Sequence, residues 1–361
     1  MRFLMACFGL ALSSGLVLGC SPPPQKETKS RRACTALEQR LSALEHSKIA
    51  EQVVQAGEQV LAENPGQQWI DLDGWAVVDL EILHYAHWND PERFAAEDGA
   101  IQTALATIRG YDQALDERDV QLVVVLIPAR LDTDPSHLPG VNLPPEVQSA
   151  NPGLVRFLLE LNRSGVDALD LGPAFSKALG AKAEDELYFG YDRHWTPRAV
   201  SIAADVVREH IRDVIGLEQG QEKENSDFVV KRERADYLIP PAMPVLLPIA
   251  EKPLPLRFDR VLKLDGTPAL EQDRESPVLV LGDSFTCYYR DEACDFASQL
   301  QAGLARKLDT IAMRAAASRT VWKNVRRRKD DLAGKQVVVW LFETSLITAN
   351  TIKPVTLFPK K

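Results

Sequence analysis

Residues 277–285 read Pro-Val-Leu-Val-Leu-Gly-Asp-Ser-Phe, and this stretch decides the fold. The apolar run 278–281 is typical of a β-strand that is buried on both faces, as the strands of a parallel sheet are. Gly282 allows a tight turn after the strand, and Ser284 follows within that turn. Because ligands of open α/β sheets bind at the carboxyl ends of the strands, the stretch predicts a hydroxyl group at a binding edge.

The rest of the chain alternates similar strands with segments of helical period. This alternation predicts a doubly wound parallel α/β sheet flanked by helices, with right-handed crossovers. Residues 217–275 are rich in proline and lack a helical period, so we expect an insertion of loops and short strands there. The other strands are expected at 76–80, 120–127, 166–171, 308–313 and 337–342, and the helices at 33–63, 93–117, 153–163, 196–215, 295–307 and 320–332.

Composition and charge exclude several classes of protein. Of the 361 residues, 45% are hydrophobic and 26% are charged, which is unlike a disordered, collagen-like or coiled-coil chain. The formal net charge of −9 argues against binding to nucleic acid, which usually shows as a basic face. No Cys/His cluster has the spacing of zinc ligands, and we expect neither a metal nor another cofactor.

The first twenty residues have the pattern of an export signal. Arg2 precedes an apolar segment, 3–18, that is too short for a comfortable membrane span. Gly19-Cys20 resembles a bacterial lipobox, in which the cysteine carries the lipid; a plain secretory signal with a chance cysteine is the alternative. The predicted divisions are a lipoprotein signal peptide at 1–19, a polar tether at 20–33, a helical segment at 34–67 and an α/β domain at 68–352.

The cysteines do not define a disulfide pattern. Of the five, Cys7 would leave with the signal peptide and Cys20 would carry the lipid, so three would remain in an oxidising compartment. Cys287 and Cys294 are the closest pair and could close a small loop. Spacing alone does not fix the pairing among these two and Cys34.

A second motif, Asp192-Arg193-His194-Trp195-Thr196-Pro197, supplies a base for Ser284. The Thr-Pro pair is typical of a helix start, and in the extended segment before it Asp192 and His194 face the same side. A serine hydroxyl becomes nucleophilic when a histidine takes its proton, and a carboxylate fixes the tautomer of that histidine. Ser284, His194 and Asp192 are therefore the predicted catalytic residues. The remaining histidines lack a comparably placed carboxylate or lie on predicted helix surfaces: His46, His84, His87, His137 and His210.

Both motifs resemble those of a known family. Gly-Asp-Ser-Phe is similar to the serine block of SGNH hydrolases, and the Asp-x-His-Trp-Thr-Pro block ahead of the serine resembles SGNH-like acetyltransferase domains of the AlgJ/AlgX type. The resemblance covers about residues 68–350. Two positions depart from it. Ala315–Ala317 stands where relatives often have glycines, and Thr344 stands where an arginine often follows the glutamate of the closing strand, so any role of that arginine is lost or supplied elsewhere.

The resemblance implies an O-acetyltransferase that acts on a cell-envelope or secreted polysaccharide through an acetyl-Ser284 intermediate. A membrane-bound O-acyltransferase would supply the acetyl groups and is the implied partner. The lipid-anchored protein would lie in the periplasm, and Ser21 favours the outer membrane because an Asp at that position is associated with inner-membrane retention. Candidates for the oxyanion hole or for substrate contacts are Gly282, Tyr288, Arg290 and Ala316.

Two alternatives stay open from the sequence. A carbohydrate esterase would use the same three residues, with water in place of a sugar hydroxyl as the acceptor. A non-catalytic glycan-binding or scaffold lipoprotein could retain the fold, because fold alone does not establish activity. The sequence also does not identify the polymer or the oligomeric state.

Overall fold

The computed structural model describes residues 24–72, 75–143, 149–180, 186–190, 192–212, 214–216, 228–237, 254–270, 272–314, 318–329 and 332–358. The predicted signal peptide, Cys20 and Ala316 lie outside these residues. Among the described helices, none is long and apolar enough to cross a bilayer.

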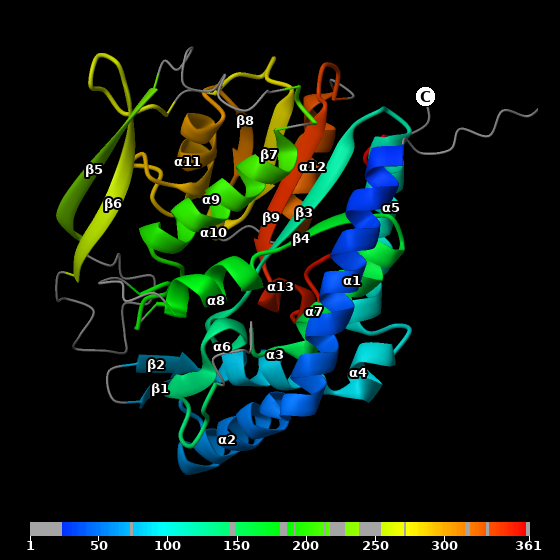
Figure 1. Cartoon of the computed structure of the whole chain (residues 1–361), viewed down its shortest axis with the longest axis vertical. Helices are drawn as coiled ribbons and strands as arrows, with labels where there is room; N and C mark the ends of the chain where they lie inside the picture. Colours follow the sequence, from blue (N-terminus) through cyan, green and yellow to red (C-terminus); the bar gives the residue numbers. More distant parts are fainter. Residues whose placement is uncertain are drawn as a thin grey trace, which may run out of the picture.

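Five strands form a parallel central sheet: β3 (Gln121–Ile127), β4 (Asp167–Asp170), β7 (Val278–Gly282), β8 (Asp309–Ala312) and β9 (Val337–Glu343). Their order is β4-β3-β9-β7-β8 (Figure 1). Every residue of β7 and β9 is buried, because helices cover both faces of the sheet. The parallel α/β sheet predicted from the apolar runs is confirmed.

The helices that cover the sheet are α5 (Ala100–Asp116), α7 (Pro152–Arg163) and α12 (Ser318–Arg328) on one face and α9 (Pro197–Ile211) and α11 (Phe296–Gly303) on the other (Figure 1). On the first face, Tyr111 of α5 stacks on Trp322 of α12 at 4.4 Å, and both pack against Trp340 of β9. On the second face, Trp195 stacks on Phe296 of α11 at 6.4 Å. These aromatic contacts fix the helices on the sheet.

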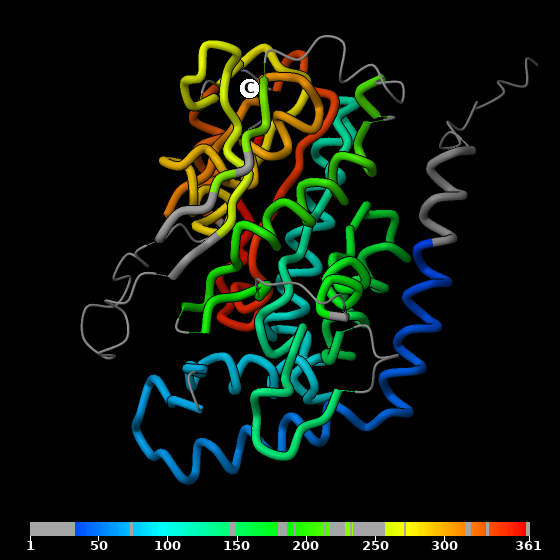
Figure 2. The backbone as a smooth tube through the Cα atoms, turned by 60° about the vertical axis from the view of Figure 1, so that its left-hand side comes forward, coloured from blue at the N-terminus to red at the C-terminus, as the bar shows by residue number. Residues whose placement is uncertain are grey.

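Two helices occupy the stretch in which a single helix is expected, α1 (Pro24–Ser47) and α2 (Ile49–Glu63). The first begins inside the predicted tether. The break falls at Lys48, whose φ of 55° places it in the left-handed region, where a helix cannot continue. α1 lies along α7 (Figure 2). An ion pair of 3.0 Å joins Arg156 of α7 to Glu45 of α1.

Two antiparallel hairpins lie outside the central sheet, β1 (Trp69–Leu72) with β2 (Trp75–Val78), and β5 (Phe228–Tyr237) with β6 (Leu254–Lys263). Within the predicted insertion, the second hairpin is longer than the short strands expected, because ten consecutive residue pairs hold it together. At its base, Phe228 and Val261 pack with Ala269 and with Ala302 of α11.

Several shorter helices connect these elements. The strand expected at 76–80 ends at Val78, because Asp79 already begins a helix. The connecting helices are α3 (Asp79–Asn89), α4 (Pro91–Ala95), α6 (Arg130–Thr133), the 3₁₀ helix η1 (Pro135–His137), α8 (Gly172–Gly180), α10 (Ser284–Cys287) and α13 (Ser345–Thr348).

The three described cysteines are free thiols. Cys287 and Cys294 are both buried, and Cys34 is half-buried. Burial raises the pKa of Cys287 to about 11, which keeps this thiol protonated and unreactive at neutral pH. The loop between Cys287 and Cys294 is therefore closed by packing and hydrogen bonds in this structure.

Candidate active site

The two sequence motifs meet at the carboxyl edge of the central sheet. Ser284 begins α10 directly after β7, and the Asp192–His194 segment lies just ahead of α9. Gly282 is required by close packing, since a Cβ there would lie 1.7 Å from Thr286 Oγ1 and 2.9 Å from the carbonyl oxygen of Leu341. The absent side chain lets the first turn of α10 approach β9, and this approach sets the position of Ser284.

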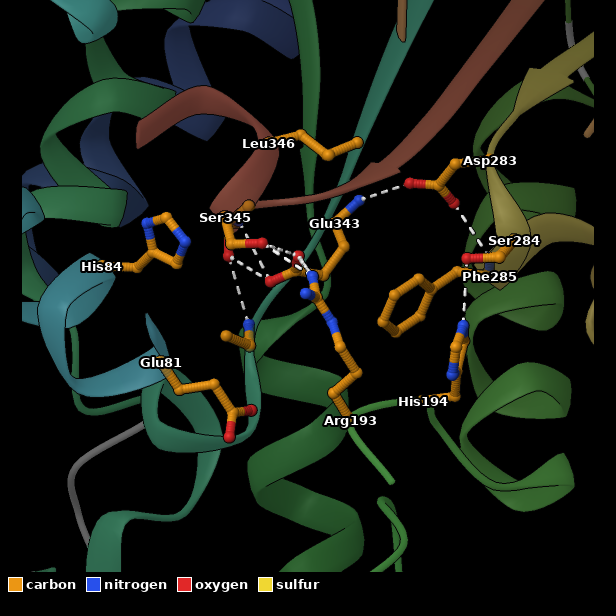
Figure 3. Close-up of polar contacts among 12 residues, drawn as sticks. Glu81, His84, Arg193, His194, Asp283, Ser284, Phe285, Glu343, Ser345 and Leu346 are labelled. Atoms are coloured by element: carbon orange, nitrogen blue, oxygen red, sulfur yellow. Dashed lines mark hydrogen bonds and ion pairs between the residues drawn. The ribbon is translucent and has the colours of Figure 1, made fainter. Parts of the chain in front are cut away.

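Asp192, His194 and Ser284 form a continuous hydrogen-bonded array, which we name the Asp192–His194–Ser284 array. His194 Nδ1 lies 2.6 Å from Asp192 Oδ1, and His194 Nε2 lies 3.0 Å from Ser284 Oγ (Figure 3 shows the second contact). The backbone N–H of His194 donates to the same Asp192 oxygen at 2.8 Å. With Nδ1–H held by the carboxylate, Nε2 is free to accept the serine proton.

Tyr288, a predicted substrate or oxyanion candidate, contacts the carboxylate of the array. Its hydroxyl donates to Asp192 Oδ2 at 2.6 Å, and its ring stacks on His194 with centroids 4.0 Å apart. Burial alone would raise the pKa of Asp192, but the hydrogen bonds and charge of His194 and the hydrogen bond of Tyr288 outweigh it and hold the pKa below its usual value. Asp192 therefore stays ionised beside His194 at neutral pH.

Trp195 joins the histidine loop to the serine loop. Its indole Nε1–H donates to the carbonyl oxygen of Phe285 at 3.0 Å, and its own carbonyl oxygen accepts from the hydroxyl of Tyr289 at 2.6 Å. Trp195 is fully buried, so both bonds are shielded from water. The residue directly after His194 thus fixes the distance between the two loops.

A buried ion pair holds the chain just ahead of the Asp-x-His motif. Arg130 bonds to Glu81 through Nε at 3.0 Å and through Nη2 at 2.5 Å. It also donates to the carbonyl oxygens of Phe189 at 2.9 Å and Ala76 at 2.7 Å. Because Arg130 is only 1% exposed, losing one partner would leave a buried charge unpaired.

Arg193, the middle residue of the motif, reaches the end of β9. Its Nη2 donates to Glu343 Oε2 at 2.6 Å and to Ser345 Oγ at 2.8 Å (Figure 3). Thr344 follows Glu343 in the sequence, and the guanidinium beside Glu343 comes from Arg193. The two motifs assign no role to Arg193, and Thr344 is the signal in the sequence that points to an arginine supplied from elsewhere in the chain.

Two further carboxyl groups are buried near the ends of β3 and β7. Burial raises the pKa of Asp283 to about 6, although the N–H of Phe285 at 2.9 Å favours its charged form. Burial likewise raises the pKa of Asp132 to about 6, against hydrogen bonds from Asn151 and from the N–H of Ala129. Asp283 and Asp132 therefore change charge close to pH 6, whereas the nearby Asp192 stays ionised at that pH.

The remaining predictions for the site have different outcomes. Arg290 lines a small pocket with Gln272, Asp295 and Thr310, and among the described residues it has no polar contact with the array. His210 was expected on a helix surface, but it is half-buried and bonds to Asp167 at 2.8 Å, a contact between distant parts of the chain that its helical position does not reveal.

The geometry of the array suits acyl transfer. The described residues hold no group of three or more His, Cys, Asp or Glu side chains placed to bind a metal ion. A histidine within 3.0 Å of a serine hydroxyl can take its proton, and the serine oxygen can then attack a carbonyl carbon.

Curated relatives of this chain carry names that describe acetyl transfer. The chain is 28% identical over 236 residues to a protein of Pseudomonas fluorescens named "Probable alginate O-acetylase AlgJ", a match that covers 59% of this chain and 57% of that protein. The protein of the same name from Pseudomonas putida KT2440 is 26% identical over 297 residues, which cover 74% and 72% of the two chains. The chain thus spans a little over half the length of the first relative.

A solved structure and a family profile agree on the fold. The O-acetyltransferase domain of Pseudomonas putida AlgJ superposes with a TM-score of 0.56 at 22% identity, covering 79% of this chain and 92% of that one, and this likeness shows the fold. The profile described as "SGNH hydrolase-like domain, acetyltransferase AlgX" matches residues 85–344, well over half of the chain. The chain therefore belongs to this family of SGNH hydrolase-like acetyltransferase domains.

Proposed function

We propose that this chain is a lipid-anchored O-acetyltransferase that transfers acetyl groups to a cell-envelope or secreted polysaccharide through an acetyl-Ser284 intermediate. The observation that carries the proposal is the Asp192–His194–Ser284 array, with 2.6 Å and 3.0 Å between its successive partners. Because relatives are named as probable alginate O-acetylases, alginate is the first acceptor to test.

In the first half of the proposed reaction, Ser284 Oγ attacks the carbonyl carbon of an acetyl donor while His194 Nε2 takes the hydroxyl proton. The bond between the acetyl carbon and the donor breaks, and the leaving group receives that proton. Asp192 holds Nδ1–H and stabilises the imidazolium that forms. The products of this half are acetyl-Ser284 and the deacetylated donor.

In the second half, a sugar hydroxyl attacks the acetyl-Ser284 ester and gives its proton to His194. The ester bond to Ser284 breaks, and Ser284 Oγ regains the proton from His194. Water in place of the sugar would give hydrolysis with the same residues. The reaction needs no cofactor.

The backbone N–H of Ser284 is the donor that we assign to the oxyanion. The two N–H groups that follow it are engaged, since Phe285 donates to the Asp283 carboxylate at 2.9 Å and Thr286 donates to the Asp283 carbonyl oxygen at 3.2 Å. One such donor contributes about 2.7–4 kcal/mol to the stability of a comparable transition state. The N–H of Ala316 remains a second candidate.

Acetyl groups would come from a membrane-bound O-acyltransferase, and a lipid on Cys20 would keep the protein at the membrane near that partner. Stable anchoring requires more than one acyl chain, and a triacylated cysteine would meet this condition. We propose a periplasmic location, with the outer membrane favoured by Ser21.

The test measures acetyl transfer from an ester pseudo-substrate, with and without an alginate oligosaccharide. We expect faster turnover and acetylated sugar when the oligosaccharide is present. Ser284→Ala and His194→Ala should each abolish turnover, and Asp192→Asn should lower it by about 10⁴-fold. If the rate of ester turnover is the same with and without the oligosaccharide, and acetate is the only product, the protein is an esterase. The scaffold alternative predicts two other results. The folded wild-type protein would show no ester turnover, and cells carrying Ser284→Ala would acetylate their polymer normally.

A further inference from the structure

Glu343 lies between the loop that carries His194 and the loop that carries Ser284. It is the last residue of β9, and β9 pairs with β3 on one side and with β7 on the other. Its side chain is only 3% exposed, and Figure 3 shows it flanked by Arg193 and by Asp283. Glu343 is thus placed to contact both loops at once.

The side chain of Glu343 holds the histidine loop. Its Oε2 accepts from Arg193 Nη2 at 2.6 Å and also from the hydroxyl of Ser345, while its Oε1 accepts from the Ser345 N–H at 3.0 Å. These contacts fix the carboxylate in one orientation. Arg193 is the neighbour in sequence of both Asp192 and His194, so a fixed guanidinium limits how far the backbone of that segment can rotate.

The backbone of Glu343 holds the serine loop. Its N–H donates to Asp283 Oδ2 at 3.4 Å, and Asp283 Oδ1 accepts from the Phe285 N–H at 2.9 Å. Asp283 therefore connects the end of β9 to the first turn of α10, where Ser284 lies. One residue of the central strand is thus hydrogen-bonded to Arg193, which precedes His194, and to Asp283, which precedes Ser284.

We infer that Arg193 and Glu343 are positioning residues that set the distance between His194 Nε2 and Ser284 Oγ. The inference rests on the proposed function for its kinetic consequences only. His194 is held from both sides in sequence, by Arg193 through Glu343 and by Trp195 through the carbonyl oxygen of Phe285. Without the first contact, the Trp195 contact still joins the loops, but the segment that carries His194 loses one of its two anchors, and we expect His194 Nε2 to lie less precisely against Ser284 Oγ.

The kinetic test compares Arg193→Met, Arg193→Lys and Glu343→Gln with the wild-type protein. We expect Arg193→Met to lower kcat about 10- to 100-fold with little change in KM, because small misplacements of reacting groups reduce the rate by such factors. Arg193→Lys keeps the charge but loses the planar fork, so it should recover part of the loss. The kcat of Glu343→Gln should lie between those of Arg193→Met and Arg193→Lys.

The matched control is Arg156→Met. Arg156 pairs with Glu45 at 3.0 Å and is 34% exposed, close to the 36% of Arg193, but it joins α1 to α7 away from the array. This variant should keep wild-type kcat. Thermal unfolding of every variant shows whether a loss of activity comes from misplaced catalytic groups or from unfolding of the protein. We expect Arg193→Met to lower kcat while its unfolding midpoint stays close to that of the wild type.

A spectroscopic measurement separates this inference from the proposed function. The Nε2 resonance of His194, followed by ¹⁵N NMR, reports the bond to Ser284, and Ser284→Ala gives the reference in which that bond is absent. We expect Arg193→Met to move the resonance towards the Ser284→Ala position. If the His194 Nε2 resonance moves in this way but the wild-type protein shows no ester turnover, the proposed function is wrong and the inference is supported. A wild-type resonance, with wild-type kcat where turnover exists, would overturn the inference.

Discussion

Tyr288 donates a hydrogen bond of 2.6 Å to Oδ2 of Asp192, the carboxylate oxygen that His194 does not use. Both oxygens of this buried carboxylate are therefore bonded, one to the imidazole and one to a phenol. A carboxylate held at both oxygens cannot rotate away from His194 Nδ1, and its charge is stabilised where burial would otherwise oppose it.

Tyr288→Phe should keep the ring stacked on His194 and remove only the hydroxyl. We expect kcat/KM to fall about tenfold, near the lower limit for the loss of a hydrogen bond to a charged group. The pKa of Asp192 should rise because one of the bonds that lower it is gone. The activity should therefore decline at a higher pH on the acid side, and a pH–rate profile measures this shift.

Tyr289→Phe is the matched control for this change. Tyr289 is also a buried residue, but its hydroxyl donates to the neutral carbonyl oxygen of Trp195 at 2.6 Å. We expect a loss of stability and an unchanged acid limb. Identical pH profiles for the two variants would argue against a special role for Tyr288.

Asp283→Asn should change how stability depends on pH. Burial raises the pKa of Asp283 in the folded protein to about 6, above the ordinary value of about 3.9 expected after unfolding. The stabilising contribution of this carboxyl is thus complete below about pH 4 and is lost as the pH rises through 6. Asn has no such loss, and it can still accept from the Phe285 N–H.

The measurement is denaturant unfolding of both proteins at pH 4 and pH 7.5. Between these values, Asp283→Asn should gain stability relative to the wild type by up to about 3 kcal/mol, the equivalent of two pKa units. A stability difference that does not vary with pH would contradict the raised pKa.

Gly282→Ala should destabilise the protein and displace Ser284. The new Cβ would lie 1.7 Å from Thr286 Oγ1 and 2.9 Å from the carbonyl oxygen of Leu341, so α10 must move away from β9. We expect a loss of about 1–3 kcal/mol in denaturant unfolding, together with lower ester turnover. Gly110→Ala is the control, because its Cβ meets nothing within 4 Å on α5 and should stabilise the helix.

Cys20→Ala tests the lipid anchor. If Cys20 carries the lipid, the variant should leave the membrane fraction or accumulate with its signal peptide still attached. Fractionation and mass spectrometry of the mature N-terminus measure both outcomes. Unchanged membrane fractionation, with no lipid on wild-type Cys20, would exclude the anchor.

The strands and the main helices could be predicted from sequence because their signals are local. The apolar run predicted at 120–127 differs by one residue from β3, since burial on both faces demands apolar side chains throughout. The hairpin of β5 and β6 was underestimated because its long pairing joins two segments whose polar residues carry no buried-strand pattern. Lys48, an ordinary helix residue by composition, gave no sign of the break between α1 and α2.

The site shows the same limit. Asp192, His194 and Ser284 could be singled out because two short motifs contain them and the fold predicts where each motif lies. The partners of Arg193 could not be predicted in this way, because Glu343 is 150 residues away in sequence. Only the position of β9 in the sheet brings Glu343 next to Arg193. Tyr288 was singled out, but its orientation towards Asp192 depends on the exact course of the turn after α10.

The position of β9 has a consequence for how the chain folds. Among the described strands it is the last in sequence, yet it lies in the middle of the sheet, between the pair β3–β4 and the pair β7–β8. Until β9 is in place, each pair presents an unpaired edge and the two have no strand in common. A chain synthesised from its N-terminus therefore completes this sheet only once β9 has been made.

We expect the segments that precede β9 not to form a stable sheet alone, because the two strand pairs share no strand until β9 joins them. A chain that stops at residue 336 should then lack a cooperative unfolding transition, whereas adding a peptide of residues 337–358 should restore it. A cooperative transition in the truncated chain alone would show that the two strand pairs are stable without β9.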